Sequence, residues 1–215
     1  PAETVDVNAN CSDHHNHHTQ VDPNLRPTLE IGTQRHPIPA HIKARVRLVH
    51  YNDIDPDCSP GIINYSGRME LHGTPMERTW IKLSSTASSG ATTVQLDHAP
   101  DWKVGDRVII TGAVKNEAFK SSGDSFKNGG GETEENTIVS ISGKTVTLSS
   151  SLKHTHGVHG EFKPEVANLS RNVIISSKNP SGVRGHTMYH YGSLGSISYA
   201  EFAQLGKDGV LARYP

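Results

Sequence analysis

The sequence predicts an all-β protein, and three observations carry that prediction. Valine and isoleucine outnumber leucine by 30 to 12, and β-branched side chains favour strands over helices. Turn-forming glycine, proline and serine recur along the 215 residues. No window of 11 residues keeps the i, i+3, i+4, i+7 apolar face of an amphipathic helix. We therefore expect short strands joined by tight turns.

Composition excludes two classes of partner. Lys and Arg total 21 against 22 Asp and Glu, and no basic block occurs, so the sequence argues against nucleic-acid binding. No run of about 18 apolar residues is present, so we expect no membrane-spanning helix in this segment. Hydrophobic residues make up 33% of the chain, which predicts a thin, spread-out core.

The strand pattern begins after a polar arm, residues 1–27, that is rich in proline and histidine. In residues 42–50 apolar and polar residues alternate, which is typical of a half-buried strand. Further short strands are expected at 28–32, 62–63, 68–73, 79–83, 93–96 and 107–110.

The clearest hairpin joins residues 136–141 to 144–148. Ser142-Gly143 lies between these two β-branched runs, and such a pair is a two-residue turn signal. The preceding segment, residues 115–133, is rich in glycine and charge and is expected to form a mobile loop.

The last third has a different rhythm. Short strands at 172–176, 186–190 and 196–202 are spaced by glycine-bearing turns, as in the rungs of a parallel β-helix. The pattern still continues at Pro215, so we expect the segment to belong to a longer β-solenoid chain.

Two cysteines and three sequons bear on the compartment. Cys11 and Cys58 fit one structural disulfide in an oxidising compartment, with two unpaired thiols as the alternative. Sequons at Asn10, Asn64 and Asn168 are about as many as chance gives, so they permit N-glycosylation without arguing for it.

Histidine clusters are candidate ligands for a divalent metal such as Zn²⁺ or Cu²⁺. The candidates are His14, His15, His17 and His18 in the arm, His154, His156 and His159 in a later loop, and His186 with His190 on one strand. The competing interpretation of the first cluster is a solvated arm, and that of the second is a polar loop. For His186 and His190 the alternatives are stacking on a solenoid surface and an inward-facing histidine with satisfied hydrogen bonds.

A carboxylate pair flanks an aromatic ring in the turn Asp101-Trp102-Lys103-Val104-Gly105-Asp106. Such a group suits a sugar, because aromatic faces stack on pyranose rings and carboxylates accept hydroxyl hydrogens. The structural interpretation makes Asp101 and Asp106 turn-capping residues. It buries Trp102 under the hairpin of residues 136–148, beside Val104 and Val108.

No catalytic motif is present: the sequence lacks G-x-S-x-G, H-E-x-x-H and a phosphate-binding Walker loop. An assignment as an enzyme is therefore left open.

Several stretches together resemble the G8 domain family. They are Leu29-Glu30-Ile31-Gly32-Thr33, Met69-Glu70-Leu71-His72-Gly73, Thr79-Trp80-Ile81-Lys82-Leu83, the Asp101–Asp106 turn, Glu134-Glu135-Asn136-Thr137-Ile138, residues 165–174, Gly185-His186 and residues 211–215. The resemblance implies an extracellular β-rich module, a sandwich or roll, followed by a right-handed parallel β-helix. On that basis we expect a polar arm at 1–27, a G8-type β domain at 28–171 and the start of a β-helix at 172–215.

The same resemblance bears on function. It implies an extracellular or cell-surface module that is carbohydrate-associated, with a polysaccharide and the remainder of its own longer chain as partners. Glu134 and Glu135 stand where the family keeps two acids and are candidate ligand-binding residues, with surface charge as the alternative. The competing functions are a non-catalytic part of a cell-surface coat, filament or receptor ectodomain, and a fragment of a hyaluronan-degrading enzyme.

Overall fold

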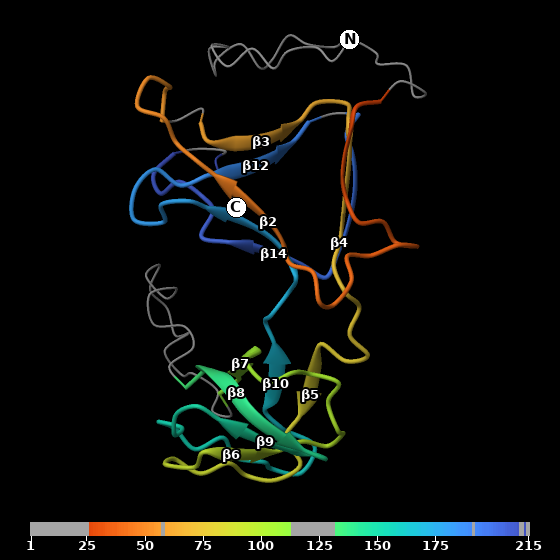
Figure 1. The fold of residues 1–215 in the computed structure, drawn as a ribbon. Helices are drawn as coiled ribbons and strands as arrows, with labels where there is room; N and C mark the ends of the chain where they lie inside the picture. Colours follow the sequence, from red (N-terminus) through yellow and green to blue (C-terminus); the bar gives the residue numbers. More distant parts are fainter. Residues whose placement is uncertain (1–25, 57–58, 113–131, 191, 211–212, 214–215) are drawn as a thin grey trace. The chain divides into compact units, whose positions relative to one another are not determined.

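The protein is built from β-strands (Figure 1). The computed structural model describes residues 26–56, 59–112, 132–190, 192–210 and 213. Within these residues there are 14 strands and no helix, which confirms the predicted all-β class. No described segment is a helix of the length and apolarity that a membrane crossing requires. The chain divides into two compact units: unit 1 combines Pro1–Pro75 with Arg171–Pro215, and unit 2 is Met76–Ser170.

Unit 1 consists of three parallel sheets. Its strands are β1 (Thr28–Ile31), β2 (Ala44–Leu48), β3 (Gly61–Asn64), β4 (Arg68–His72), β11 (Val173–Ser177), β12 (His186–Tyr189), β13 (Leu194–Ser198) and β14 (Ala200–Ala203). The sheet orders are β1-β4-β13, β14-β11-β2 and β12-β3. Consecutive strands therefore lie in different sheets, and each new strand pairs in parallel with one from the turn before, as in a parallel β-helix.

The core of unit 1 lies between these sheets. Alternation along β4 sends Met69 and Leu71 inwards, where they pack with Val173 and Ile175 of β11. Glu70 and His72 occupy the alternate positions of β4, and they are also buried. β4 thus places apolar side chains on one face of the sheet β1-β4-β13 and the buried polar side chains of Glu70 and His72 on the other.

The two compact units divide the chain differently from the expected domains. Residues 28–72 were expected to form a sandwich or roll with the rest of a domain ending at 171. In the structure β2, β3 and β4 pair in parallel with strands that follow residue 172, and β1 pairs in parallel with β4. The parallel turns begin at β1, and unit 2 is inserted in sequence between β4 and β11. Short alternating strands look alike in either arrangement, because alternation reports burial of one face and says nothing about the pairing partner.

Unit 2 is one curled antiparallel sheet. Its strands are β5 (Trp80–Lys82), β6 (Thr93–Gln95), β7 (Arg107–Ile110), β8 (Glu134–Ser142), β9 (Thr145–Leu148) and β10 (Glu165–Asn168), in the order β5-β10-β7-β8-β9-β6. An isolated bridge between Leu83 and Leu96 joins the two ends. The predicted hairpin is β8-β9, and Gly143 turns it with a φ of 58°, a conformation that favours glycine.

Candidate functional site

The two tryptophans of unit 2 have opposite environments. Trp102 is 6% exposed, packs in the core with Ile138 and Val146, and donates its indole N–H to the Arg78 carbonyl at 2.7 Å. Its predicted burial is confirmed, although its neighbour Val104 is 66% exposed. Trp102 is therefore a core residue and offers no ring face to a ligand.

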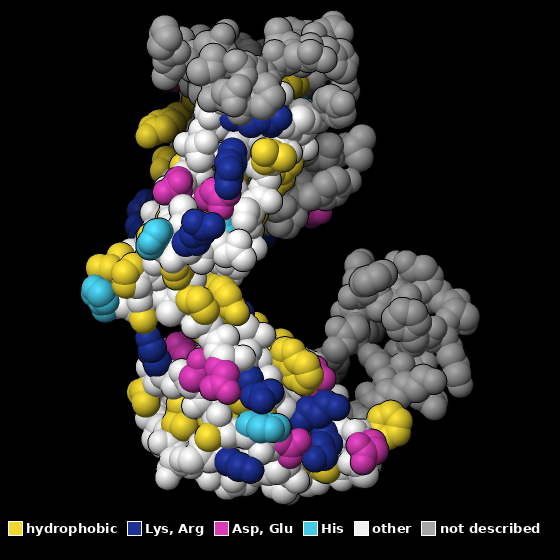
Figure 2. Space-filling view, turned by 90° about the vertical axis from the view of Figure 1, so that its right-hand side faces the viewer, with side chains coloured by type: hydrophobic (Ala, Val, Ile, Leu, Met, Phe, Trp, Pro, Cys, Tyr) yellow, Lys and Arg dark blue, Asp and Glu magenta, His cyan; other side chains and the backbone are white. Residues whose placement is uncertain are grey.

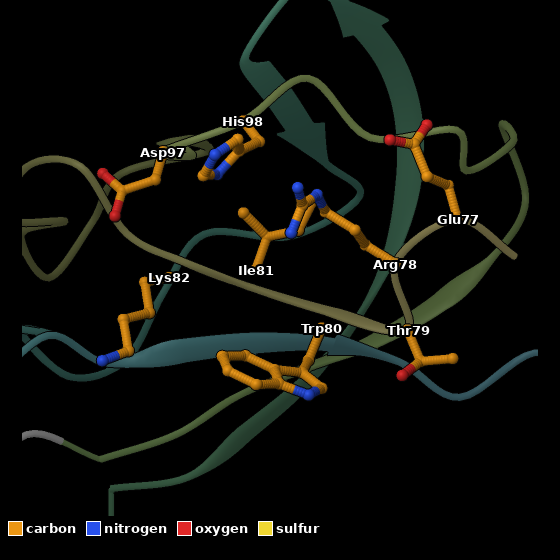
Figure 3. Close-up of a pocket in the computed structure, with 8 residues that line it drawn as sticks. All are labelled: Glu77, Arg78, Thr79, Trp80, Ile81, Lys82, Asp97 and His98. Atoms are coloured by element: carbon orange, nitrogen blue, oxygen red, sulfur yellow. The ribbon is translucent and has the colours of Figure 1, made fainter.

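Trp80 is the tryptophan that faces solvent. The strand β5 buries Ile81 and leaves Trp80 50% exposed, because successive side chains point to opposite faces. Figure 3 shows Trp80 and Lys82 projecting from the same side of the strand and Ile81 from the other. An indole plane and a lysine ammonium thus lie next to each other on one surface.

A groove of about 390 Å³ surrounds this strand. Its lining residues, drawn in Figure 3, are Glu77, Arg78, Thr79, Trp80, Ile81, Lys82, Asp97 and His98. At one end Asp97 forms an ion pair with Lys163, Nζ to Oδ2 at 3.1 Å. The groove therefore combines one large apolar face with hydrogen-bond donors and acceptors of both charges, a combination that suits a polar ligand with apolar patches.

Charge is mixed across the surface as well. In Figure 2 the basic and acidic side chains of the described residues alternate with hydrophobic ones, and no broad field of one sign forms on the face shown. This agrees with the formal net charge of −1. Ligand selection at the groove must therefore come from local contacts rather than from a global field.

The two predicted aspartates have structural partners. Asp101 Oδ2 accepts the Glu77 backbone N–H at 2.7 Å. Asp106 Oδ2 accepts the Lys103 N–H at 2.9 Å and the Asn168 side-chain amide at 2.7 Å. These contacts agree with the turn-capping interpretation, and neither carboxylate lines the groove.

The two predicted glutamates separate, as neighbours on a strand must. Glu135 is exposed, and its Oε1 receives a hydrogen bond from Arg107 Nε at 2.7 Å. Glu134 is buried, and its carboxylate accepts the backbone N–H groups of Lys153 and His154 at 2.8 Å. It also faces His156 Nε2 at 3.1 Å. Burial opposes ionisation of Glu134, but these hydrogen bonds and the imidazole lower its pKa below 4.5 overall.

The histidines do not assemble a metal centre in the described part of the chain, where no group of three or more His, Cys, Asp or Glu side chains is placed to hold an ion. His156 is fully buried and its Nδ1 contacts the Thr111 carbonyl at 2.8 Å. His186 is also fully buried, and its ring packs against Gly61 of the neighbouring turn. His190 stacks on Tyr65 with ring centroids 4.1 Å apart. His14, His15, His17 and His18 lie outside the described residues.

The predicted modifications have different outcomes. Cys11, Cys58 and Asn10 lie outside the described residues, as does most of the loop expected at 115–133. Asn64 is 8% exposed and donates its amide to the Leu194 carbonyl at 3.2 Å. Asn168 is 1% exposed. A glycan attached to either buried amide nitrogen would displace these contacts, so neither side chain is an available acceptor in the folded chain.

Sequence reasoning missed the Trp80 groove, although one signal for it was present. The run Thr79-Trp80-Ile81-Lys82-Leu83 alternates, and placing Ile81 and Leu83 in the core forces Trp80 outwards. The contribution of Asp97 and His98 had no such signal, because the bridge between Leu83 and Leu96 brings that segment beside β5.

Comparisons with known proteins agree on the family. A G8 domain-containing protein of Dictyostelium discoideum is 32% identical over 163 residues, 73% of this chain and 10% of the relative. Human fibrocystin-L is 35% identical over 120 residues, 51% of this chain and 3% of the relative. The Dictyostelium relatives are much longer proteins, of which the chain spans about a tenth. No family model matches the chain.

Among solved structures, the tailspike of Pseudomonas phage phi297 is similar, with a TM-score of 0.37 and 17% identity over 85% of this chain and 27% of the tailspike. The G8 relatives match 73% of the chain, and those of the quoted motifs that fall within the described residues lie on the strands and turns of both units. The chain therefore belongs to the G8 domain family.

Proposed function

We propose that this chain is a glycan-binding module of an extracellular or cell-surface protein, and that unit 2 binds the glycan at the Trp80 groove. The half-exposed indole of Trp80 carries the proposal. An exposed indole offers a flat apolar face, and it lies beside polar groups that sugars use. The G8 relatives support the extracellular placement.

The contacts suit a pyranose ring. Its apolar C–H face would stack on the Trp80 indole, while Lys82 donates to ring or acidic oxygens. Arg78 and His98, whose side chains approach each other in Figure 3, supply donors on the other rim, and Asp97 accepts hydroxyl hydrogens. Because the groove carries side chains of both charges, it can contact both neutral and acidic polysaccharides.

The test is binding of immobilised polysaccharides by the whole chain, with hyaluronan as the acidic probe and dextran as the neutral one. Trp80→Ala is expected to weaken binding at least roughly tenfold, or about 1.4 kcal/mol, and Trp80→Phe to retain most of it. Tyr51→Ala is the matched control, because Tyr51 is 64% exposed and does not line the groove.

The outcomes distinguish the candidate functions. Binding of hyaluronan that fails at high salt indicates recognition by Arg78 and Lys82, whereas salt-resistant binding of dextran indicates stacking alone. Equal binding by Trp80→Ala and the unaltered chain would reject the groove. Failure to retain either polymer would favour the structural role in a coat or receptor ectodomain.

A further inference from the structure

A polar relay covers the outer face of β4 in unit 1. Arg68 Nε donates to Glu70 Oε1 at 2.6 Å, and Glu70 Oε2 lies 2.7 Å from His72 Nε2. The other ring nitrogen, His72 Nδ1, lies 2.7 Å from the hydroxyl oxygen of Ser198. Glu70 and His72 are 4% and 2% exposed, and Ser198 is partly exposed. A serine hydroxyl is therefore linked through a buried imidazole to a buried carboxylate.

Parallel pairing places these residues together. β13 lies beside β4 with Ser198 opposite His72 and Ser196 opposite Glu70. Adjacent parallel strands keep aligned side chains on the same face, so residues 126 positions apart in sequence become neighbours. The backbone reinforces the alignment, since the Gly73 N–H donates to the Ser198 carbonyl at 3.0 Å.

The hydrogen-bond partners fix where the protons lie. The hydrogen bond from Arg68 is the largest influence on Glu70 and, with help from His72, lowers the pKa of that carboxyl below 4.5 despite its burial. An ionised carboxylate can only accept, so His72 Nε2 carries the hydrogen that it donates. In the neutral ring Nδ1 then has a free lone pair, and it accepts the Ser198 hydroxyl hydrogen.

The position of Ser198 suits attack on a ligand. It is the last residue of β13 and directly precedes Tyr199, whose φ of 51° lies in the left-handed region that non-glycine residues rarely adopt. A Cβ at Gly73 would come within 2.1 Å of the Tyr199 carbonyl oxygen, so this corner requires glycine at 73. A serine held at such a corner, next to a base that a third group orients, has the arrangement of an activated nucleophile.

We propose that Ser198, His72 and Glu70 form a nucleophilic site that transfers acyl groups from carboxylic esters. The Ser198 proton moves to His72 Nδ1 as Oγ bonds to the ester carbonyl carbon. The ester C–O bond then breaks, and the departing alcohol takes the proton from Nδ1. Water then gives a proton to His72 Nδ1 and attacks the acyl carbon, the bond to Ser198 Oγ breaks, and Oγ takes the proton back as the carboxylic acid leaves. No oxidant or further reactant is required.

The test is covalent labelling of the whole chain with a fluorophosphonate, which phosphonylates activated serines with loss of fluoride. Peptide mass spectrometry is expected to find the adduct on Ser198, together with slow release of nitrophenol from p-nitrophenyl acetate. Ser198→Ala should abolish both. His72→Gln should slow labelling about 100-fold, the contribution typical of a general base, and Glu70→Gln should slow it to a lesser degree.

Two controls keep the result decisive. Ser196→Ala alters the serine of β13 that lies opposite Glu70, and it should leave the labelling rate of Ser198 unchanged. Trp80→Ala should also leave it unchanged, which separates this site from the glycan groove. If His72→Gln fails to fold, Ser198→Cys and Ser196→Cys replace it, and the thiol at 198 should react with iodoacetamide at least tenfold faster. Labelling of Ser198 no faster than other serines of the folded chain would overturn the proposal.

Discussion

Among the residues that the structure describes, each unit buries one histidine–glutamate pair, and the two pairs differ in what lies on the far side of the imidazole. In unit 1 His72 faces Glu70 at 2.7 Å, and in unit 2 His156 faces Glu134 at 3.1 Å, in both cases through Nε2. The Nδ1 of His72 meets the hydroxyl of Ser198, which can give or take a hydrogen.

The Nδ1 of His156 meets the Thr111 carbonyl, which can only accept. That ring nitrogen must therefore carry hydrogen. With Glu134 ionised, Nε2 donates as well, so both ring nitrogens of His156 face hydrogen-bond acceptors. The ring has no lone pair to offer as a base. The same residue pair thus serves as a relay in one unit and as a structural ion pair in the other, and the third partner decides which.

The largest expected effect concerns the hydrophobic core of unit 2. Trp102→Ala should lower the free energy of unfolding by about 3–5 kcal/mol, because the cavity is not refilled by its packed neighbours. Chemical denaturation followed by circular dichroism measures the loss. Trp80→Ala is the matched control, and its stability should stay within about 0.5 kcal/mol of the unaltered chain. Equal stability of the two variants would contradict the assigned environments.

The second prediction compares the carboxylates directly. Glu134→Gln should destabilise by about 3 kcal/mol, because a carboxamide presents an NH₂ group to a set of donors and removes the carboxylate that faces His156. Glu70→Gln should cost clearly less, because its cationic partner Arg68 has a half-exposed side chain that water can solvate. A larger loss for Glu70→Gln, measured by the same denaturation, would reverse the comparison.

Acid should lower the stability of both units against unfolding. The pKa values of Glu70 and Glu134 are lowered on folding, so each group stabilises the folded chain above pH 4.5 and loses that contribution as pH falls through its folded pKa. Thermal melts between about pH 6 and pH 3.5 should show a falling midpoint. Glu134→Gln and Glu70→Gln should each flatten the slope. A midpoint independent of pH over this range would refute the assignment.

The smallest effect is spectroscopic. Nitrogen-15 NMR of the imidazole rings should show hydrogen on both nitrogens of His156 and only on Nε2 of His72, under conditions where both glutamates are ionised. Ser198→Ala should alter the Nδ1 signal of His72 and leave His156 unchanged. One shared protonation pattern for the two rings would remove the distinction between relay and ion pair.

Local signals in the sequence were sufficient for the strand content. Alternation in residues 42–50 and 79–83 identified strands, and Ser142-Gly143 identified the β8-β9 hairpin, because side-chain period and turn chemistry depend on adjacent residues. The core role of Trp102 followed from the same local pattern. The pairing partners did not: β2, β3 and β4 pair in parallel with strands that lie beyond the expected boundary at 171.

What the sequence determined by itself is the set of short strands, their turns and the G8 family. Tertiary structure alone decided which distant residues meet. Parallel turns place Ser198 beside His72, and the curled sheet of unit 2 places Asp97 beside β5. The physical reason is that strand periodicity records only which face of each segment is buried, whereas a site depends on which strands are hydrogen-bonded neighbours and in what register.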